Sequence, residues 1–214
     1  MTNKPFWRRP RVAIGWLLSP TWMLAHSAKA DLRGATRSRL IRSRNVLYLR
    51  VSLGVAAIAQ LISMIDGNLI HRPALLPVRI IVAAYLISRC NEVFYAFYRD
   101  ALEKIVSRSG PKSSLSWARR LRLALNSYAE LIVDFALLYF LLPKGAFQPE
   151  PASLADHLFY SASTITTSGG GGVNPHGVAA RLLTDYEIFC GLILLVVCFA
   201  VYVGRALSEK EGRS

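Results

Sequence analysis

Long apolar stretches dominate the chain, and the connections between them are short and polar. Four such stretches lie at roughly 46–70, 75–98, 123–142 and 182–203. Each approaches or exceeds the roughly 20 residues that a helix needs to cross a bilayer. Because a backbone inside lipid must satisfy its own hydrogen bonds, helices are the expected form. The pattern therefore predicts an all-α membrane protein with four transmembrane helices.

A fifth amphipathic stretch, residues 153–165, is too short to cross a membrane. It follows Pro149-Glu150-Pro151, and Ser153 and Asp156 have the spacing of a helix cap with an acidic residue in the first turn. We expect a re-entrant helix over 154–165 that ends at Thr166 or Thr167. Its carboxyl end would present partial negative charge to a cation inside the membrane.

Basic residues set the expected orientation. The formal net charge is +13; residues 1–50 carry eleven Lys and Arg, and residues 99–122 carry seven more. The two opposite connections carry little more than Arg72 and Lys144. The positive-inside rule then predicts a multi-pass cell-membrane protein with both termini in the cytoplasm. Since topology explains the charge, we expect no nucleic acid partner.

The first 30 residues have two interpretations. Arg8-Arg9-Pro10-Arg11, the apolar run 12–25 and Ala28-Lys29-Ala30 resemble a cleavable signal peptide. Cleavage, however, would move the basic residues that follow to the outer side, and Pro20 interrupts the apolar run. An uncleaved amphipathic segment at the cytoplasmic interface is favoured, with three tryptophans as anchors: Trp7, Trp16 and Trp22.

Charged residues inside the expected spans need partners, because charges at membrane depth are costly. The second span contains Arg79, Arg89 and Glu92, and the third contains Glu130 and Asp134, four residues apart. The rise of a helix places Arg89 and Glu130 at about the same depth. We therefore predict that Arg89 pairs with Glu130 and that Arg79 lies near Asp134. The alternative is a shorter, tilted span with Arg89 and Glu92 at the cytoplasmic interface.

A run of threonines, a serine and glycines follows the short helix: Thr164-Ile165-Thr166-Thr167-Ser168-Gly169-Gly170-Gly171-Gly172. A cation filter turns backbone carbonyls inward at successive residues, and glycine tolerates the positive φ that such a path requires. Three other interpretations fit poorly. A flexible linker would not lie between apolar helices. A phosphate loop would end in glycine-lysine-serine or threonine, and a dinucleotide turn would follow a strand.

Residues 158–204 resemble the pore of tetrameric potassium channels. That family reads threonine, threonine, valine, glycine, tyrosine, glycine, aspartate, two variable residues and proline. The same positions here, without a gap, are Thr166, Thr167, Ser168, Gly169, Gly170, Gly171, Gly172, Val173, Asn174 and Pro175. The family's glycine-arginine pair falls on Ala180-Arg181, and its inner-helix hinge glycine falls on Gly191.

This resemblance implies a homotetramer whose permeant ion is K⁺, with Na⁺ as the alternative, and no cofactor. Backbone carbonyls would bind the ion at Thr167, Ser168, Gly169, Gly170 and Gly171, and the Thr167 hydroxyl would add the innermost ring. Gly191 would be the gating hinge. Residues at the pore mouth would be Asp156, Gly172 and Asp185, and Glu187 is a further candidate there. Pairing with Arg181 is the alternative role for Asp185 and Glu187.

Three positions depart from the family's filter. Gly170 replaces the tyrosine that packs outward, Gly172 replaces the aspartate, and Ser168 replaces an apolar residue. Four consecutive glycines lack a side chain to brace the filter and cost more entropy to order. Potassium conduction is therefore the first prediction. A non-selective cation channel and a non-conducting scaffold or regulatory subunit are the alternatives.

The expected organisation has four parts. A basic cytoplasmic or interfacial segment covers 1–45, and Arg33–Arg50 either touches anionic membrane lipid or serves only as a topology signal. An accessory two-helix module covers 46–109, a potassium-channel-like pore module 122–207, and a short tail 208–214. The break at 110–114, Gly-Pro-Lys-Ser-Ser, separates the two modules, and Asp66-Gly67-Asn68 marks the turn that ends the first span.

The sequence contains no arrangement typical of an enzyme. Its three cysteines, Cys90, Cys190 and Cys198, lie in the spans and are expected to be apolar packing residues. The histidines do not approach metal-ligand spacing. His157 is expected to be a surface residue, with a role in sensing external pH as the less favoured alternative.

Overall fold

The computed structural model describes residues 19–29, 32, 34–106, 115–198, 200 and 203–204. Its helices are α2 (Pro20–Lys29), α3 (Gly34–Ile65), α4 (Leu76–Val106), α5 (Trp117–Phe140), α6 (Leu154–Ile165) and α7 (Val178–Leu192). Three short helical segments are η1 (Leu69–His71), η2 (Pro73–Leu75) and the π-helical η3 (Ile193–Cys198). Strands β1 (Phe147–Gln148) and β2 (Asn174–Pro175) pair antiparallel. The predicted anchors Trp7 and Trp16, the break at 110–114 and the tail at 208–214 lie outside the described residues.

The described chain is mostly helical, and α3, α4 and α5 are each long and apolar enough to cross a membrane. These observations confirm the predicted all-α membrane fold. The fourth apolar stretch forms α7, which continues directly into η3. Helix α3 is uninterrupted from Gly34, so the basic segment and the first apolar stretch are one helix, and residue 45 lies inside it. The turn at 66–68 ends that helix as predicted.

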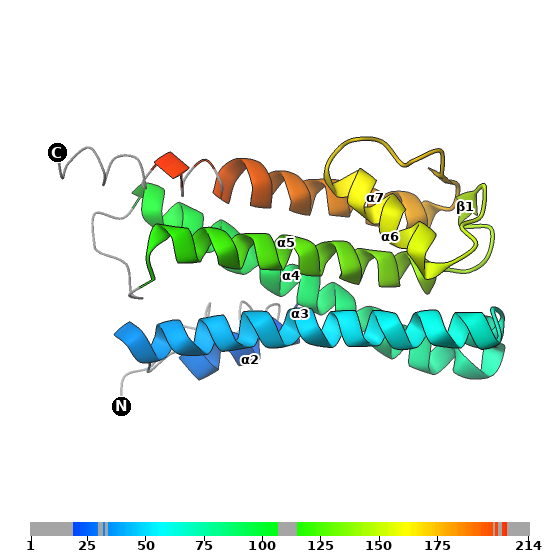
Figure 1. The fold of residues 1–214 in the computed structure, drawn as a ribbon, viewed down its shortest axis with the longest axis horizontal. Helices are drawn as coiled ribbons and strands as arrows, with labels where there is room; N and C mark the ends of the chain where they lie inside the picture. The colour runs from blue at the N-terminus through cyan, green and yellow to red at the C-terminus, as the bar shows by residue number, and fades with distance from the viewer. Residues whose placement is uncertain are drawn as a thin grey trace, which may run out of the picture.

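Helix α5 lies at the centre of the helical bundle (Figure 1). It packs against α3 on one side and α6 and α7 on the other, and α4 crosses behind it. Its core residues Leu131, Phe135, Ala136 and Tyr139 are at most 1% exposed. The short helix α6 therefore rests on the most buried of the three candidate membrane helices, beside the end that carries β1.

Polar contacts join the first two long helices to α5. The Arg89 guanidinium of α4 donates to Glu130 of α5, with Nε 2.6 Å from Oε1. This contact confirms the predicted pair, and Arg89 is buried in the bundle. In α3, the Asn45 amide donates to Ser127 Oγ at 2.7 Å. Side-chain hydrogen bonds of this kind hold helices together in lipid, where apolar surface alone gives no driving force.

The predicted proximity of Arg79 to Asp134 is wrong. Arg79 Nε donates to the Leu141 carbonyl at 3.2 Å, just beyond the last residue of α5. The carbonyls at a helix C-terminus have no partner within the helix, so a guanidinium is attracted there. Asp134 consequently lacks the cation that equal depth had suggested.

Helix α2 packs against α4. The hydroxyls of Ser19 and Thr21 donate to the Ser88 carbonyl at 2.8 and 2.9 Å. The Trp22 ring meets the Tyr95 ring edge-on, with centroids 4.7 Å apart. Trp22 therefore contacts a neighbouring helix.

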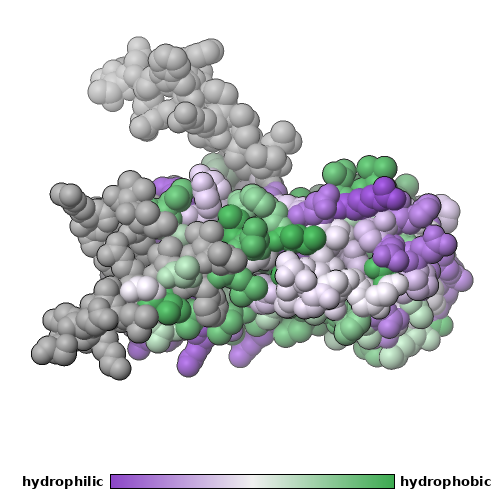
Figure 2. Space-filling view, turned by 90° about the horizontal axis from the view of Figure 1, so that it is seen from above, coloured by the Kyte–Doolittle hydropathy of each residue, from purple (hydrophilic) through white to green (hydrophobic). Residues whose placement is uncertain are grey.

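Figure 2 shows polar side chains gathered at the β1 end of the molecule and apolar side chains over the middle of the same face.

Candidate functional site

The site begins with a capped helix. Ser153 Oγ accepts from the Asp156 backbone N–H at 3.3 Å, and the Asp156 carboxylate accepts from the Ser153 N–H at 2.9 Å. This reciprocal capping box starts α6 at Leu154, and Thr166 is its C-cap. The predicted helix over 154–165 is confirmed. Asp156, a predicted mouth residue, is exposed, and its carboxylate serves the cap.

A buried hydrogen-bond network fixes α6 between its neighbours. Ser161 Oγ donates to the Ile132 carbonyl of α5 at 2.9 Å and also bonds to the Glu187 carboxyl of α7. The Tyr139 hydroxyl of α5 donates to the other Glu187 oxygen at 2.6 Å. Glu187 is fully buried, so its predicted position at the pore mouth is wrong. One carboxyl instead connects three helices behind the threonine-glycine segment.

The backbone turns sharply after α6. Positive φ angles occur at Thr167 (58°), Gly169 (92°), Gly171 (60°) and Gly172 (87°). Three of the four consecutive glycines thus adopt a conformation that side chains disfavour. Thr167 adopts it despite a branched Cβ, which marks a strained position. The Ser168 N–H donates to the Ser163 carbonyl at 2.9 Å and so ties this turn to the end of α6.

Aromatic rings of α6 close against the other side of the glycine run. A Cβ at Gly170 would lie 2.8 Å from Tyr160 Cε2 and 2.5 Å from the Val173 carbonyl oxygen. A Cβ at Gly171 would overlap the Phe159 ring. The expectation that the four glycines lack any brace is therefore wrong, because Tyr160 and Phe159 supply ring contacts from the helix. The sequence did not reveal that rings of α6 stand where filter side chains would otherwise be, since this depends on how α6 packs against the turn.

The tip of the segment is a hydrogen-bonded turn. The Val173 N–H donates to the Gly170 carbonyl at 3.0 Å, and the chain then enters β2, which pairs with β1. Among the five predicted carbonyl ligands, Gly170 therefore has its oxygen engaged in this single chain. Residues Thr167, Ser168 and Gly169 are exposed along the same path, as are Gly171 and Gly172.

Gly191, the predicted hinge, is a point of close helix contact. A Cβ there would lie 2.6 Å from Ile165 Cγ1 and 2.7 Å from the Ile165 carbonyl oxygen. Glycine thus lets α7 approach the last residue of α6, a packing requirement that the sequence did not indicate. The π-helical segment η3 begins two residues later, at Ile193.

The remaining predicted mouth residue, Asp185, is exposed on α7. The predicted pairing of Arg181 with Asp185 or Glu187 does not occur among the described contacts. Arg181 Nε instead donates to the Pro175 carbonyl at 3.2 Å, which holds β2 against the start of α7. Asp185 therefore remains a free-standing carboxylate close to the turn in sequence.

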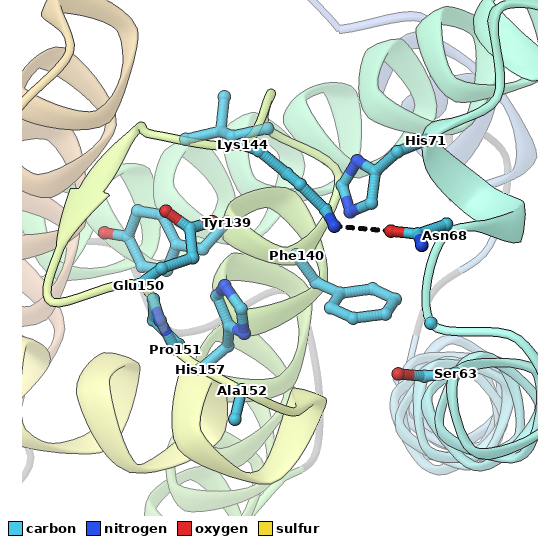
Figure 3. Close-up of a pocket in the computed structure, with 12 residues that line it drawn as sticks. Ser63, Asn68, His71, Tyr139, Phe140, Lys144, Glu150, Pro151, Ala152 and His157 are labelled. Carbon is cyan, nitrogen blue, oxygen red and sulfur yellow. Dashed lines mark hydrogen bonds between the residues drawn. The ribbon is translucent and has the colours of Figure 1, made fainter.

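A cavity of about 310 Å³ lies beside the start of α6 (Figure 3). Lys144 bonds to the Asn68 side chain across it, which brings together the two weakly charged connections. His71 lines it, and burial together with the nearby charges of Arg79 and Lys144 lowers the pKa of His71 below its ordinary value of 6.5.

His157 also lines this cavity and is only 5% exposed, so its predicted surface position is wrong. Its Nδ1 lies 2.8 Å from the Ser153 carbonyl oxygen, and its ring packs between those of Phe140 and Phe147. His157 therefore belongs to the aromatic packing that holds the first turn of α6.

Comparison with known proteins places the similarity on the same part of the chain. Residues 127–209 match a family model described as "Ion channel". The chain is also 28% identical over 99 residues to the inward rectifier potassium channel Kirbac3.1 from Paramagnetospirillum magnetotacticum. That alignment covers 46% of this chain and 34% of the relative, so the chain spans about a third of that protein's length. No solved structure matches the chain.

Proposed function

We propose that residues 127–209, which match the "Ion channel" family model, act as a pore domain of the potassium-channel type, and that the chain conducts monovalent cations, potassium first, as one subunit of a homotetramer. Conduction would be passive, so no catalytic residue or cofactor takes part. The pore module would comprise α5, α6, the threonine-glycine turn and α7. Helices α3 and α4 would form the accessory module.

One observation carries this proposal. The carboxyl end of the capped helix α6 meets a turn with positive φ at Thr167, Gly169, Gly171 and Gly172, and buried contacts from α5 and α7 hold the helix. A helix C-terminus offers partial negative charge, and a backbone in this conformation can direct carbonyl groups toward an ion. We assign ion binding to the carbonyls of Thr167 through Gly171. Asp156, Gly172 and Asp185 would lie at the pore mouth, and Gly191 would be the hinge.

Four chains are needed because each carries a single re-entrant loop. The surface of α6 and α7 supports this assembly, since large apolar side chains there are at least half exposed in the single chain: Phe159, Val178, Leu182, Phe189 and Leu192. Lipid or a neighbouring subunit must cover such a surface. In an assembled pore, the turn that engages the Gly170 carbonyl would open toward the axis.

The rings of Tyr160 and Phe159 favour potassium over a non-selective pore. A filter selects between ions through the number and spacing of its carbonyl ligands, and packing behind the filter limits how far they can move. Both rings touch the glycine run where a side chain would otherwise stand. The run is therefore braced from α6, despite having no side chains of its own.

Membrane placement follows from the charge distribution. We place the 66–75 and 141–153 connections outside, where Lys144 contacts Asn68, and both termini in the cytoplasm. The arginines at the start of α3 would then face the inner leaflet, where anionic lipid attracts basic residues.

The reversal potential of the purified protein in a planar bilayer, with potassium on one side and sodium on the other, tests the proposal. We expect a value near the potassium equilibrium potential. A value near zero with clear cation current would instead establish a non-selective pore. Confirmed tetramers that pass no current under any applied voltage would favour the scaffold or regulatory alternative. The Gly169→Ala variant, which we expect to pass no ions, measures the background current.

A further inference from the structure

The interface between α3, α4 and α5 contains an acidic cluster that lies apart from the threonine-glycine turn. Arg89 and Glu92 belong to α4, and Glu130 and Asp134 belong to α5. All four residues are at most 5% exposed in the single chain. Three carboxyl groups and one guanidinium therefore lie together in helices that are expected to cross the membrane, where an unbalanced charge is costly.

Two of the three carboxyl groups have that guanidinium as their partner. Arg89 Nε and Nη2 donate to the two Glu130 oxygens at 2.6 and 3.1 Å. Arg89 Nη1 lies 2.7 Å from a Glu92 oxygen. The three guanidinium nitrogens of Arg89 are thus all engaged by Glu130 and Glu92.

Asp134 is different. It is 0% exposed, and among the residues that the structure describes neither of its carboxyl oxygens has a hydrogen-bond partner. Glu187, on the other side of α5, is equally buried but bonds to two hydroxyl groups. Burial alone therefore does not distinguish Asp134; the lack of a hydrogen bond within the described part of the chain does.

The groups that surround Asp134 cannot neutralise it. The Ser52 hydroxyl of α3 faces Asp134, and Glu130 lies one turn earlier on α5. From α4, the groups that face Asp134 are Arg89, already engaged, Tyr85 and Cys90. Among the described residues, no group of three His, Cys, Asp or Glu side chains has the arrangement of a metal site. A proton is the one cation that a single carboxyl group can bind without further ligands.

We propose that Asp134 is a proton-binding site, a neutral carboxylic acid whose hydroxyl donates to Ser52 Oγ between α3 and α5. An ionised carboxylate there would have no counter-ion of its own, because Arg89 is already engaged, and of the described groups around it only the Ser52 hydroxyl could donate to it. The neutral acid needs only one acceptor, which Ser52 provides. Proton uptake is a simple association, in which one carboxylate oxygen gains one proton and no other bond changes.

The proposed proton lies between the accessory helix α3 and the pore-module helix α5. Ser52 belongs to the accessory helix α3, and Asp134 belongs to the helix that supports α6. Loss of the proton would leave two carboxylates one turn apart on α5, with a single guanidinium already shared. We therefore expect protonation of Asp134 to hold the accessory helix against the pore domain. This inference stands whether or not the chain conducts ions.

Infrared spectroscopy of the purified protein in lipid vesicles at neutral pH tests the assignment. The carbonyl stretch of a protonated carboxylic acid should be present in wild type and missing from Asp134→Asn, so it should appear in the difference between the two spectra. The Glu130→Gln variant is the matched control, because Glu130 is ion-paired and its loss should remove no such band. If Asp134→Asn folds and the protonated band is unchanged, Asp134 is ionised and the proposal is wrong.

The Ser52→Ala variant keeps the carboxyl group and provides a second measurement, which also decides the question if Asp134→Asn does not assemble. Removing the acceptor should shift the same carbonyl band to higher frequency without removing it. An unshifted band would show that Ser52 does not accept this proton, and would overturn the proposed site.

Discussion

At the scale of single residues, missing side chains shape the threonine-glycine turn as much as present ones do. Gly171 combines a positive φ with a ring in the space that a Cβ would occupy, whereas Gly169 has the positive φ and open space. The two positions therefore separate conformational strain from steric overlap. Gly191 shows steric overlap alone, against Ile165.

Replacement of Gly169 or Gly171 by alanine should abolish ion flux while subunits still assemble. A Cβ in the left-handed region costs about 1–2 kcal/mol per residue, and Gly171→Ala adds the overlap with Phe159. Flux into vesicles and native molecular mass measure the two effects. Gly54→Ala is the control, because an added Cβ there meets no atom within 4 Å. Wild-type flux in both variants would contradict the assignment of the filter.

At the scale of elements, the capping box sets where α6 begins. Ser153→Ala should destabilise the protein by about 1 kcal/mol, since it removes the acceptor for a backbone N–H at the helix start. Thermal unfolding in detergent measures the change. Ser116→Ala is a matched control: Ser116 is the N-cap of α5 but makes no capping hydrogen bond through its side chain. Equal effects at the two serines would argue against a specific role for the Ser153 cap.

The Arg89–Glu130 pair joins α4 to α5, and breaking it should cost far more than a surface ion pair. Arg89→Ala leaves two buried carboxylates without a counter-ion, for which about 3–5 kcal/mol is expected. Charge reversal at either partner alone should prevent assembly. Charge reversal at both partners should restore assembly. The recovery should be only partial, because Arg89→Glu would also place a negative charge beside Glu92. Size-exclusion chromatography reports the outcome, and failure of any rescue would count against a direct pair.

At the scale of the whole molecule, the exposed apolar surface of α6 and α7 requires a partner. Co-expression of wild type with an equal amount of Gly169→Ala tests how many subunits share one pore. If one variant subunit blocks a tetramer, random mixing leaves about one sixteenth of the pores intact. A dimer would retain about one quarter of the flux by the same reasoning. Flux that falls only by half would mean that each chain acts alone.

The sequence was sufficient wherever local rules dominate. The spacing of Ser153 and Asp156 predicts α6 to the residue, because a cap is formed by neighbours along the chain. The long apolar stretches predict the membrane helices, since lipid leaves the backbone no other form. Equal depth predicted the Arg89–Glu130 pair because both residues lie on regular helices. The pattern after Ile165 was enough to place a family resemblance on this half of the chain.

Tertiary structure decided everything that depends on which faces meet. The same depth argument failed for Arg79, which turns toward a helix end, and left Asp134 buried with no donor. Glu187 and His157 looked like surface groups, yet packing placed both inside. The rings that brace the glycine run come from α6, because only the angle between that helix and the turn brings them together. Helix positions follow from local sequence; rotations and contacts follow from packing of the whole chain.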